Sequence, residues 1–294
     1  MRAILDVPAP AKLNLFLHVT GQRADGYHLL QSAFMLVDWC DTLHFEVRGD
    51  EAITREDLGA ALPAEDLVVR AARALRSAAK VAHGVHIAID KRIPAEAGLG
   101  GGSSDAASTL LALNRLWGTR LGLAELERIG LALGADVPFF LRGTNAWVEG
   151  IGEKLEPIEL PPARFLVAKP AEGLATRAIF ADPTLKGDSD AATITGFAAN
   201  PYRFGRNDLQ PVAERQCPGI GQALRWLASQ GLEGRMTGSG SAVFALTGSG
   251  PQVSGRPPGR PAVAPDGWQV RECGNMEAHP LAGWAFSDDS SVDG

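Results

Sequence analysis

A glycine-rich stretch directly before a helix-forming segment constrains this chain most. Residues 94–110 read PAEAGLGGGSSDAASTL, and alanine and leucine dominate the segment after the glycines. The first N–H groups of a helix lack partners within the helix, and the helix dipole adds partial positive charge there. Glycines let an anion approach those N–H groups closely. The stretch therefore predicts a phosphate-binding loop. The alternative is a flexible connector without a ligand, which does not usually lead straight into an amphipathic helix.

Two common phosphate-binding motifs do not fit this stretch. The chain contains no GxxxxGK[ST] sequence, so the loop is not a P-loop. A dinucleotide fingerprint needs its glycines directly after a strand, and an acidic residue about 20 residues later at the end of a second strand. Here the segment KRIPAEA, residues 91–97, separates the expected strand from the glycines. A nicotinamide-dependent oxidoreductase is therefore an alternative that the sequence disfavours.

Composition and charge narrow the class of protein further. The chain has 294 residues, 45% of them hydrophobic and 21% charged, which is typical of a soluble globular protein with one large or two ordinary domains. The net charge of −6 disfavours a nucleic-acid or anionic-membrane partner. Three scattered cysteines form neither a CxxC motif nor a Cys/His cluster, and no segment resembles a signal peptide or a membrane span. We therefore expect a cytoplasmic protein.

Helices and strands are expected in both halves of the chain, which indicates an α+β fold. Strands are predicted at residues 12–19 (with one buried face), 29–39, 42–47, 85–89, 145–148 and 165–168. Helices are predicted at residues 67–79, from the glycine loop to 117, and at 123–133 and 220–230. We expect a first domain at 1–158, a second at 159–285 and a disordered tail at 286–294.

A second glycine turn and two charged residues are further candidates for the site. Residues 236–243 read MTGSGSAV, which is either an ordinary tight turn or part of a polyphosphate site. Lys12 interrupts an apolar strand, as a lysine on a solvated face or as a group that neutralises charge. Asp136 follows the helix stop at Gly134, as a cap or turn residue or as a catalytic base. Phosphoryl transfer needs groups that position the reactants and neutralise charge.

Three motifs together resemble the GHMP kinases (galacto-, homoserine, mevalonate and phosphomevalonate kinases). They are PAKLNLFL at 10–17, PAEAGLGGGSSDAA at 94–107 and MTGSGSAVFA at 236–245. The resemblance covers most of residues 8–245. The segment GQRADGYH, residues 21–28, is similar to the branch that phosphorylates the 2-hydroxyl of a cytidine diphosphate sugar alcohol in the non-mevalonate isoprenoid pathway. A kinase with a mevalonate- or homoserine-type acceptor stays the nearest alternative.

The resemblance implies an architecture and a set of small-molecule ligands. The first domain should resemble the second domain of ribosomal protein S5, and the second should be ferredoxin-like. ATP, Mg²⁺ and the acceptor should meet in the cleft between them. We expect no nucleic acid or membrane partner, and either a monomer or a homodimer.

The resemblance also implies roles for single residues. Lys12 and Asp136 match the catalytic pair, in which the carboxylate orients or deprotonates the acceptor hydroxyl and the ammonium stabilises developing charge. Ser104 is the expected contact to Mg²⁺. The expected ATP-binding residues are Lys91 (near the adenine), Pro94, Gly98, Leu99, Gly100, Gly101, Gly102, Ser103 and Ser104.

Four further residues match the acceptor site. Tyr27 and Phe180 correspond to aromatic residues that sandwich the cytosine, and such stacking contributes about 1–3 kcal/mol per base. His28 would read the edge of the base, and Asn14 lies on the same strand as Lys12. Without the resemblance, Tyr27 reads as a turn tyrosine packed on the surface.

Three features depart from the family pattern. Asp66 stands where an asparagine often reads adenine, and a carboxylate cannot donate, so Asp66 is either a nucleotide contact or a helix cap. Glu96 brings negative charge to the glycine loop, which should weaken phosphate binding unless it faces away or pairs with a cation such as Arg92. A Gly/Pro-rich segment after Thr247 replaces an expected helix.

Overall fold

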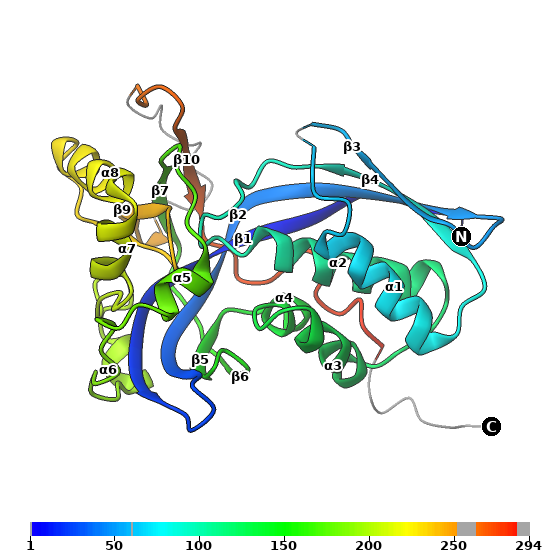
Figure 1. The fold of residues 1–294 in the computed structure, drawn as a ribbon, viewed down its shortest axis with the longest axis horizontal. Helices are drawn as coiled ribbons and strands as arrows, with labels where there is room; N and C mark the ends of the chain where they lie inside the picture. The colour runs from blue at the N-terminus through cyan, green and yellow to red at the C-terminus, as the bar shows by residue number, and fades with distance from the viewer. Residues whose placement is uncertain (1, 60, 252–262, 287–294) are drawn as a thin grey trace.

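The computed structural model describes residues 2–59, 61–251 and 263–286. It contains two sheets, each with its own group of helices, and the β1–β2 hairpin runs from one group to the other (Figure 1). The α+β class and the two-part architecture expected from the sequence are confirmed. Among the described residues, no helix has the length and apolar character needed to cross a bilayer.

The first sheet has the order β3-β4-β2-β5-β6, with β1 also paired to β2. Only the β3–β4 pair is parallel. Helices α1 to α4 pack against this sheet around one apolar cluster. The strands are β1 (Ala3–Gln22), β2 (His28–Arg48), β3 (Ile53–Asp57), β4 (Gly84–Asp90), β5 (Ala146–Gly150) and β6 (Lys154–Pro157). The helices are α1 (Leu67–Ala79), α2 (Gly101–Leu116), α3 (Leu123–Leu133) and α4 (Val137–Arg142).

Strand β1 differs from the half-buried strand that alternation predicts. Its residues from Val7 to Val19 are nearly all buried, because the strand contributes to three apolar clusters in turn. Val7 belongs to the first-domain cluster, Leu13 to the cluster between the sheets, and Val19 to the second-domain cluster. The interpretation of Lys12 as a lysine on a solvated face is therefore wrong.

Strand β2 is one continuous strand where the sequence predicts two. The pairing of β1 with β2 shifts between Pro10↔Cys40 and Ala11↔Val37. This irregularity accommodates the polar break in the sequence, at Asp38 to Asp41, without ending the strand. The interruption in the pattern marks a bulge rather than a turn.

The second sheet is antiparallel, with the order β10-β7-β9-β8. When these four strands are numbered by their order in the chain, they lie side by side in the sheet as 4-1-3-2, and helices connect strand 1 (β7) to strand 2 (β8). This is the strand order of the ferredoxin-like fold. Among residues 263–268 no helix is present, and residues 252–262 of the Gly/Pro-rich segment lie outside the described chain. The strands are β7 (Ala163–Lys169), β8 (Gly234–Met236), β9 (Val243–Ser249) and β10 (Gln269–Gly274). The helices are α5 (Thr176–Phe180), α6 (Ile194–Ala198), α7 (Gln210–Gln216) and α8 (Pro218–Ser229).

The end of the described chain returns to the first domain. Ala278 and Phe286 form bridges with Thr144 and Gly122, and Leu281 is buried in the first-domain cluster. Residues 276–286 therefore pack with the first domain, although the sequence-based division places residues up to 285 in the second. Residues 287–294 of the expected tail lie outside the described chain.

Candidate active site

Two glycine turns pack against each other where the domains meet. Gly98 has a φ of +72°, and a Cβ atom there would lie 2.2 Å from the carbonyl oxygen of Thr237. The backbone N–H of Ala242 donates to the carbonyl of Ala97 over 3.1 Å. The close approach requires glycine, and it joins the two small-residue turns that the sequence predicts into one site.

The glycine loop ends at an uncapped helix start. Helix α2 begins at Gly101, and its N-cap is Gly100, which has a φ of +71° and no side chain to accept a hydrogen bond. The N–H groups of the first turn therefore have no side-chain cap, which is the arrangement that binds anions at helix N-termini.

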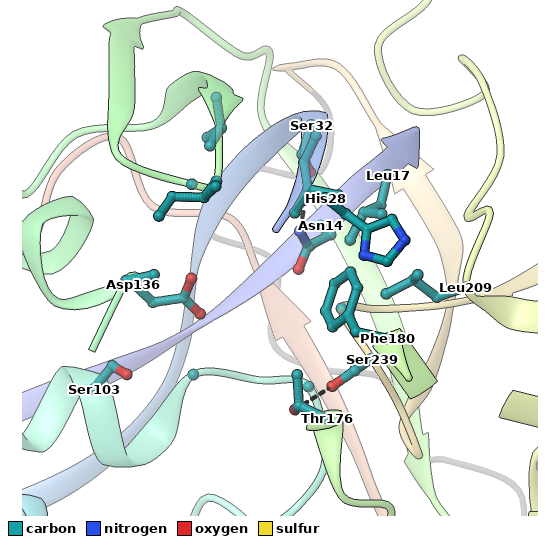
Figure 2. A pocket seen from close by; sticks show the side chains of 18 of the residues that line it. Asn14, Leu17, His28, Ser32, Ser103, Asp136, Thr176, Phe180, Leu209 and Ser239 are labelled. Atoms are coloured by element: carbon teal, nitrogen blue, oxygen red, sulfur yellow. Dashed lines mark hydrogen bonds between the residues drawn. The ribbon is translucent and has the colours of Figure 1, made fainter. Parts of the chain in front are cut away.

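A cavity of about 830 Å³ connects this loop to the β1–β2 turn and to the second domain. Ser103 lies on one side of it, the rings of His28 and Phe180 lie on the other, and Asp136 lies between them (Figure 2). Most of the sequence-predicted site residues line it: Lys12, Asn14, Tyr27, His28, Gly98, Gly100, Gly101, Gly102, Ser103, Asp136 and Phe180.

Lys12 and Asp136 form an ion pair at the centre of the cavity. The distance from Lys12 Nζ to Asp136 Oδ2 is 3.4 Å, and the side chains are 4% and 30% exposed. Asp136 is the N-cap residue of α4, but its side chain makes no capping hydrogen bond. The carboxylate is thus directed to Lys12 and the cavity, which favours the catalytic interpretation over the cap.

A hydrogen-bonded chain holds the Lys12 side chain in place. The ammonium donates to Asn14 Oδ1, and Asn14 Nδ2 donates to Ser32 Oγ over 2.9 Å. The ammonium also lies 4.2 Å from the centre of the Phe34 ring. Asn14, predicted as an acceptor contact, therefore already orients Lys12. No sequence pattern points to Ser32, which lies 18 residues further along the chain than Asn14.

Two rings from different domains meet at the other end of the cavity. The centroids of the His28 and Phe180 rings are 5.5 Å apart, with 34° between their planes. Leu17 and Leu209 line the same end (Figure 2). Tyr27 lies at the cavity rim with 60% of its surface exposed. The apolar side chains of Leu17, Phe180 and Leu209 thus lie beside a histidine that can form hydrogen bonds.

Four predicted nucleotide contacts do not line the cavity: Lys91, Pro94, Leu99 and Ser104. Leu99 is buried, and its carbonyl accepts a 2.9 Å hydrogen bond from the Lys12 backbone N–H. Ser104 is fully buried in the first turn of α2, and its hydroxyl has no hydrogen-bond partner among the described residues. Leu99 thus supports the site through its backbone contact to Lys12, while the Ser104 hydroxyl remains without a hydrogen-bond partner among the described residues.

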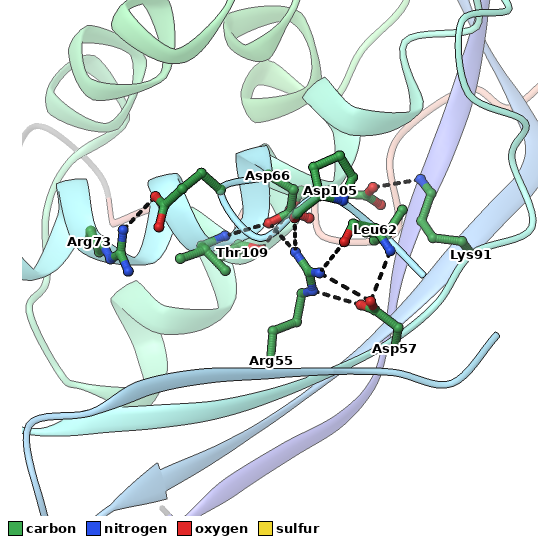
Figure 3. Close-up of polar contacts among 11 residues, drawn as sticks. Arg55, Asp57, Leu62, Asp66, Arg73, Lys91, Asp105 and Thr109 are labelled. Carbon is green, nitrogen blue, oxygen red and sulfur yellow. Dashed lines mark hydrogen bonds and ion pairs between the residues drawn. The ribbon is translucent and has the colours of Figure 1, made fainter. Parts of the chain in front are cut away.

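Lys91 is held in a buried cluster behind the loop (Figure 3). Its ammonium lies 2.6 Å from Asp105 Oδ2 and also bonds to Asp41. Burial lowers the pKa of Lys91, but the two carboxylates outweigh that effect and raise it overall. Burial raises the pKa of Asp105 well above its ordinary value, against the opposing charge of Lys91. The ammonium already has two anionic partners, so the structure does not bring it to a ligand.

The structure shows the contacts of Asp66 and Glu96, the two residues that depart from the family pattern near the nucleotide site. Asp66 is the N-cap of α1, accepts a 3.0 Å hydrogen bond from the Val69 N–H and pairs with Arg55 (Figure 3), which confirms the cap interpretation. Glu96 lines the cavity, and Arg92 pairs with Asp90 instead. Of the two arrangements that would relieve the charge of Glu96, pairing with Arg92 is therefore absent from the described residues, and Glu96 does not face away from the cavity.

Models of two protein families match this chain. The GHMP kinases N terminal domain model matches residues 66–144, and the GHMP kinases C terminal model matches residues 191–255. A curated relative from Albidiferax ferrireducens, named 4-diphosphocytidyl-2-C-methyl-D-erythritol kinase, is 64% identical over 99% of this chain and 99% of its own. The chain belongs to the GHMP kinase family, in this 4-diphosphocytidyl-2-C-methyl-D-erythritol kinase branch.

Solved structures agree with the place of this GHMP kinase in its family. A crystal structure of 4-(cytidine 5'-diphospho)-2C-methyl-D-erythritol kinase matches with a TM-score of 0.70 and 36% identity, covering 83% of this chain and 90% of the other. A mevalonate kinase structure matches with a TM-score of 0.63 and 15% identity, covering 93% of this chain and 100% of the other, which supports the shared fold alone.

Proposed function

We propose that this GHMP kinase transfers the γ-phosphate of ATP to the 2-hydroxyl of 4-diphosphocytidyl-2-C-methyl-D-erythritol, a step of the non-mevalonate isoprenoid pathway. One observation carries the proposal. A single cavity has an uncapped glycine loop on one side, the Lys12–Asp136 pair at its centre, and the His28–Phe180 rings at the other end. Phosphates, a reacting hydroxyl and a nucleobase fit these three parts in that order.

The central pair can perform the transfer. The Asp136 carboxylate accepts the hydroxyl proton while the oxygen forms its bond to the γ-phosphorus and the bond to the ADP oxygen breaks. The Lys12 ammonium, fixed by Asn14, stabilises the negative charge on the transferring group. The backbone N–H groups at the start of α2 hold the phosphates without any charged side chain.

The residues around the loop are compatible with Mg²⁺. This ion retains several waters and takes one or two protein oxygens beside substrate phosphates, so it needs no dedicated cage. Ser104 Oγ is buried without a partner, and Ser103 lines the cavity, so both hydroxyls are candidates to hold it. When bound, Mg²⁺ neutralises phosphate charge.

Chelation of the metal is therefore expected to abolish turnover. EDTA in excess over Mg²⁺ should reduce ADP release to the background rate, and added Mg²⁺ should restore it, because the ATP phosphates otherwise keep their full negative charge in a cavity that Asp136 and Glu96 also line. The control is circular dichroism with EDTA, which should show an unchanged fold. Full activity in EDTA would contradict the metal requirement.

Phe180→Ala is expected to weaken binding of the cytidine nucleotide. The substitution removes one stacking face, which is worth about 1–3 kcal/mol, or roughly 5- to 150-fold in affinity. Calorimetric titration with CDP measures the loss, and the KM for ATP should stay within about twofold, since Phe180 lies at the opposite end of the cavity from the glycine loop. Unchanged CDP affinity would remove Phe180 from the acceptor site.

The acceptor is tested by ADP release with each candidate alcohol in turn. The proposal expects turnover with the diphosphocytidyl compound and only background rates with mevalonate or homoserine. Turnover with either of those alone would retain the kinase chemistry and overturn our interpretation of His28 and Phe180. The cytoplasm, where ATP is abundant, is the location we propose; a monomer or homodimer stays a prediction.

A further inference from the structure

We infer that Arg177 binds the diphosphate of the acceptor and so selects a nucleoside diphosphate over a nucleoside. The inference rests on the proposed function, because it assigns one group of the proposed acceptor to one side chain. Arg177 lies on α5, in the second domain, and lines the cavity. Neither the glycine motifs nor the family resemblance points to this residue.

Helix α5 presents one face to the cavity and the other to the second-domain core. Ile179 is fully buried in that core. Thr176, Arg177, Phe180 and Ala181 all line the cavity. Arg177 and Phe180 are three residues apart and Thr176 and Phe180 are four apart, which places them on one helical face. The Arg177 side chain is therefore directed to the same space as the Phe180 ring.

Arg177 is available to bind an anion. Arg177 is exposed, and its guanidinium has no ion pair or hydrogen bond within the described chain. The other permanent cation of the lining, Lys12, is already paired with Asp136 and bonded to Asn14. A planar guanidinium with five donors matches the geometry of phosphate oxygens better than an ammonium does.

The charge of the cavity favours a cation in this role. Its lining carries two permanent cations, Lys12 and Arg177, against three carboxylates, Asp25, Glu96 and Asp136. Two of these carboxylates already have a cationic partner, because Asp136 pairs with Lys12 and Asp25 pairs with Arg23 over 2.8 Å. An acceptor diphosphate adds further negative charge on the side of the cavity away from the α2 N-terminus. Without Arg177, the one permanent cation left in the described lining would be Lys12, which is already paired with Asp136.

The order of residues along α5 points to the acceptor diphosphate rather than to ATP. Thr176 Oγ1 lies 2.7 Å from Ser239 Oγ in the second glycine turn, so the start of α5 adjoins the phosphate loops. The Phe180 ring, at the end of α5, meets His28 at the nucleobase end. Arg177 lies between them, as the diphosphate lies between the cytidine and the reacting alcohol. One sugar separates base from phosphate, a span comparable to one helical turn of about 5.4 Å.

The test compares CDP with cytidine by calorimetric titration. Arg177→Gln should weaken CDP binding about tenfold and leave cytidine binding unchanged, because only CDP carries the diphosphate. Arg177→Lys should recover part of the affinity for CDP, since the charge remains but the planar fork is lost. Arg225→Gln is the matched control: Arg225 is exposed on α8 of the same domain, outside the cavity lining, and its loss should change neither titration.

Three results would overturn the assignment of Arg177. These are equal losses for CDP and cytidine in Arg177→Gln, no loss for either, or weakened binding of a non-hydrolysable ATP analogue in place of CDP. In contrast, a wild-type protein that binds the ATP analogue but neither cytidine nor CDP would refute the proposed acceptor itself. The proposed function survives if wild-type protein binds CDP and Arg177→Gln binds it equally well.

Discussion

Asp136→Asn is expected to lower kcat by about 100- to 10,000-fold, the usual contribution of general acid–base catalysis. The amide keeps the shape of the side chain but cannot take a proton from the acceptor hydroxyl. Because the carboxylate lies 3.4 Å from Lys12 Nζ and faces the cavity, the loss should appear in kcat, with the KM for ATP nearly unchanged. Steady-state ADP release over a range of ATP and acceptor concentrations measures both quantities.

The control for this variant separates chemistry from folding. Lys12 retains its hydrogen bond to Asn14 in Asp136→Asn, so the buried ammonium keeps one partner and the protein should fold. Asp190→Asn, at an exposed aspartate outside the cavity lining, should leave kcat unchanged. A kcat within about threefold of wild type in folded Asp136→Asn would contradict the role of this carboxylate as the base.

Lys91→Met is expected to lower the free energy of unfolding by about 3–5 kcal/mol, the usual result of removing one member of a buried ionic cluster. The substitution preserves most of the side-chain volume but leaves Asp41 and Asp105, both buried, without their shared cation. Figure 3 shows the contact between Lys91 and Asp105. Urea unfolding at pH 8 measures the change. A loss below about 1 kcal/mol would show that the cluster has little effect on stability.

The same cluster gives the variant a predictable pH dependence. A carboxyl group whose pKa is raised by folding stabilises the folded state fully below its unfolded pKa, and this contribution is lost as the pH rises through the folded pKa. Burial raises the pKa of Asp105 in this way, and removing the Lys91 charge should raise it further. The gap in stability between wild type and Lys91→Met should therefore shrink from pH 8 to pH 5. Adding Asp105→Asn to Lys91→Met should recover part of the loss at pH 8.

Local sequence patterns were sufficient to predict the parts of the site that depend on backbone geometry. The glycines of residues 98–102 predict the uncapped start of α2, since few other residues tolerate the required φ angles and close contacts. Asp66 predicts the cap of α1 by its place before the first apolar residue. Local sequence also made Lys12 and Asp136 candidates, and the family resemblance gave them roles and added His28 and Phe180. These four residues lie far apart in the chain but line one cavity.

The features that sequence analysis did not predict depend on contacts between distant segments. Lys91 was expected near a ligand, but Asp41 and Asp105, 50 and 14 residues away, bind its charge. No local pattern predicts that residues 276–286 return to the first domain, because that path depends on bridges to Gly122 and Thr144. Arg177 lies in a five-residue helix, too short for periodicity to indicate which side faces a cavity.

The measurement that tests the account most directly is mass spectrometry of one competition reaction. The wild-type protein is incubated with ATP, Mg²⁺ and equal amounts of 4-diphosphocytidyl-2-C-methyl-D-erythritol, mevalonate and homoserine, beside an Asp136→Asn control. The account predicts a gain of one phosphate on the cytidyl compound alone, located by fragmentation at the 2-hydroxyl and greatly reduced in the control. A phosphate on another acceptor, or transfer that is undiminished in the control, would contradict it.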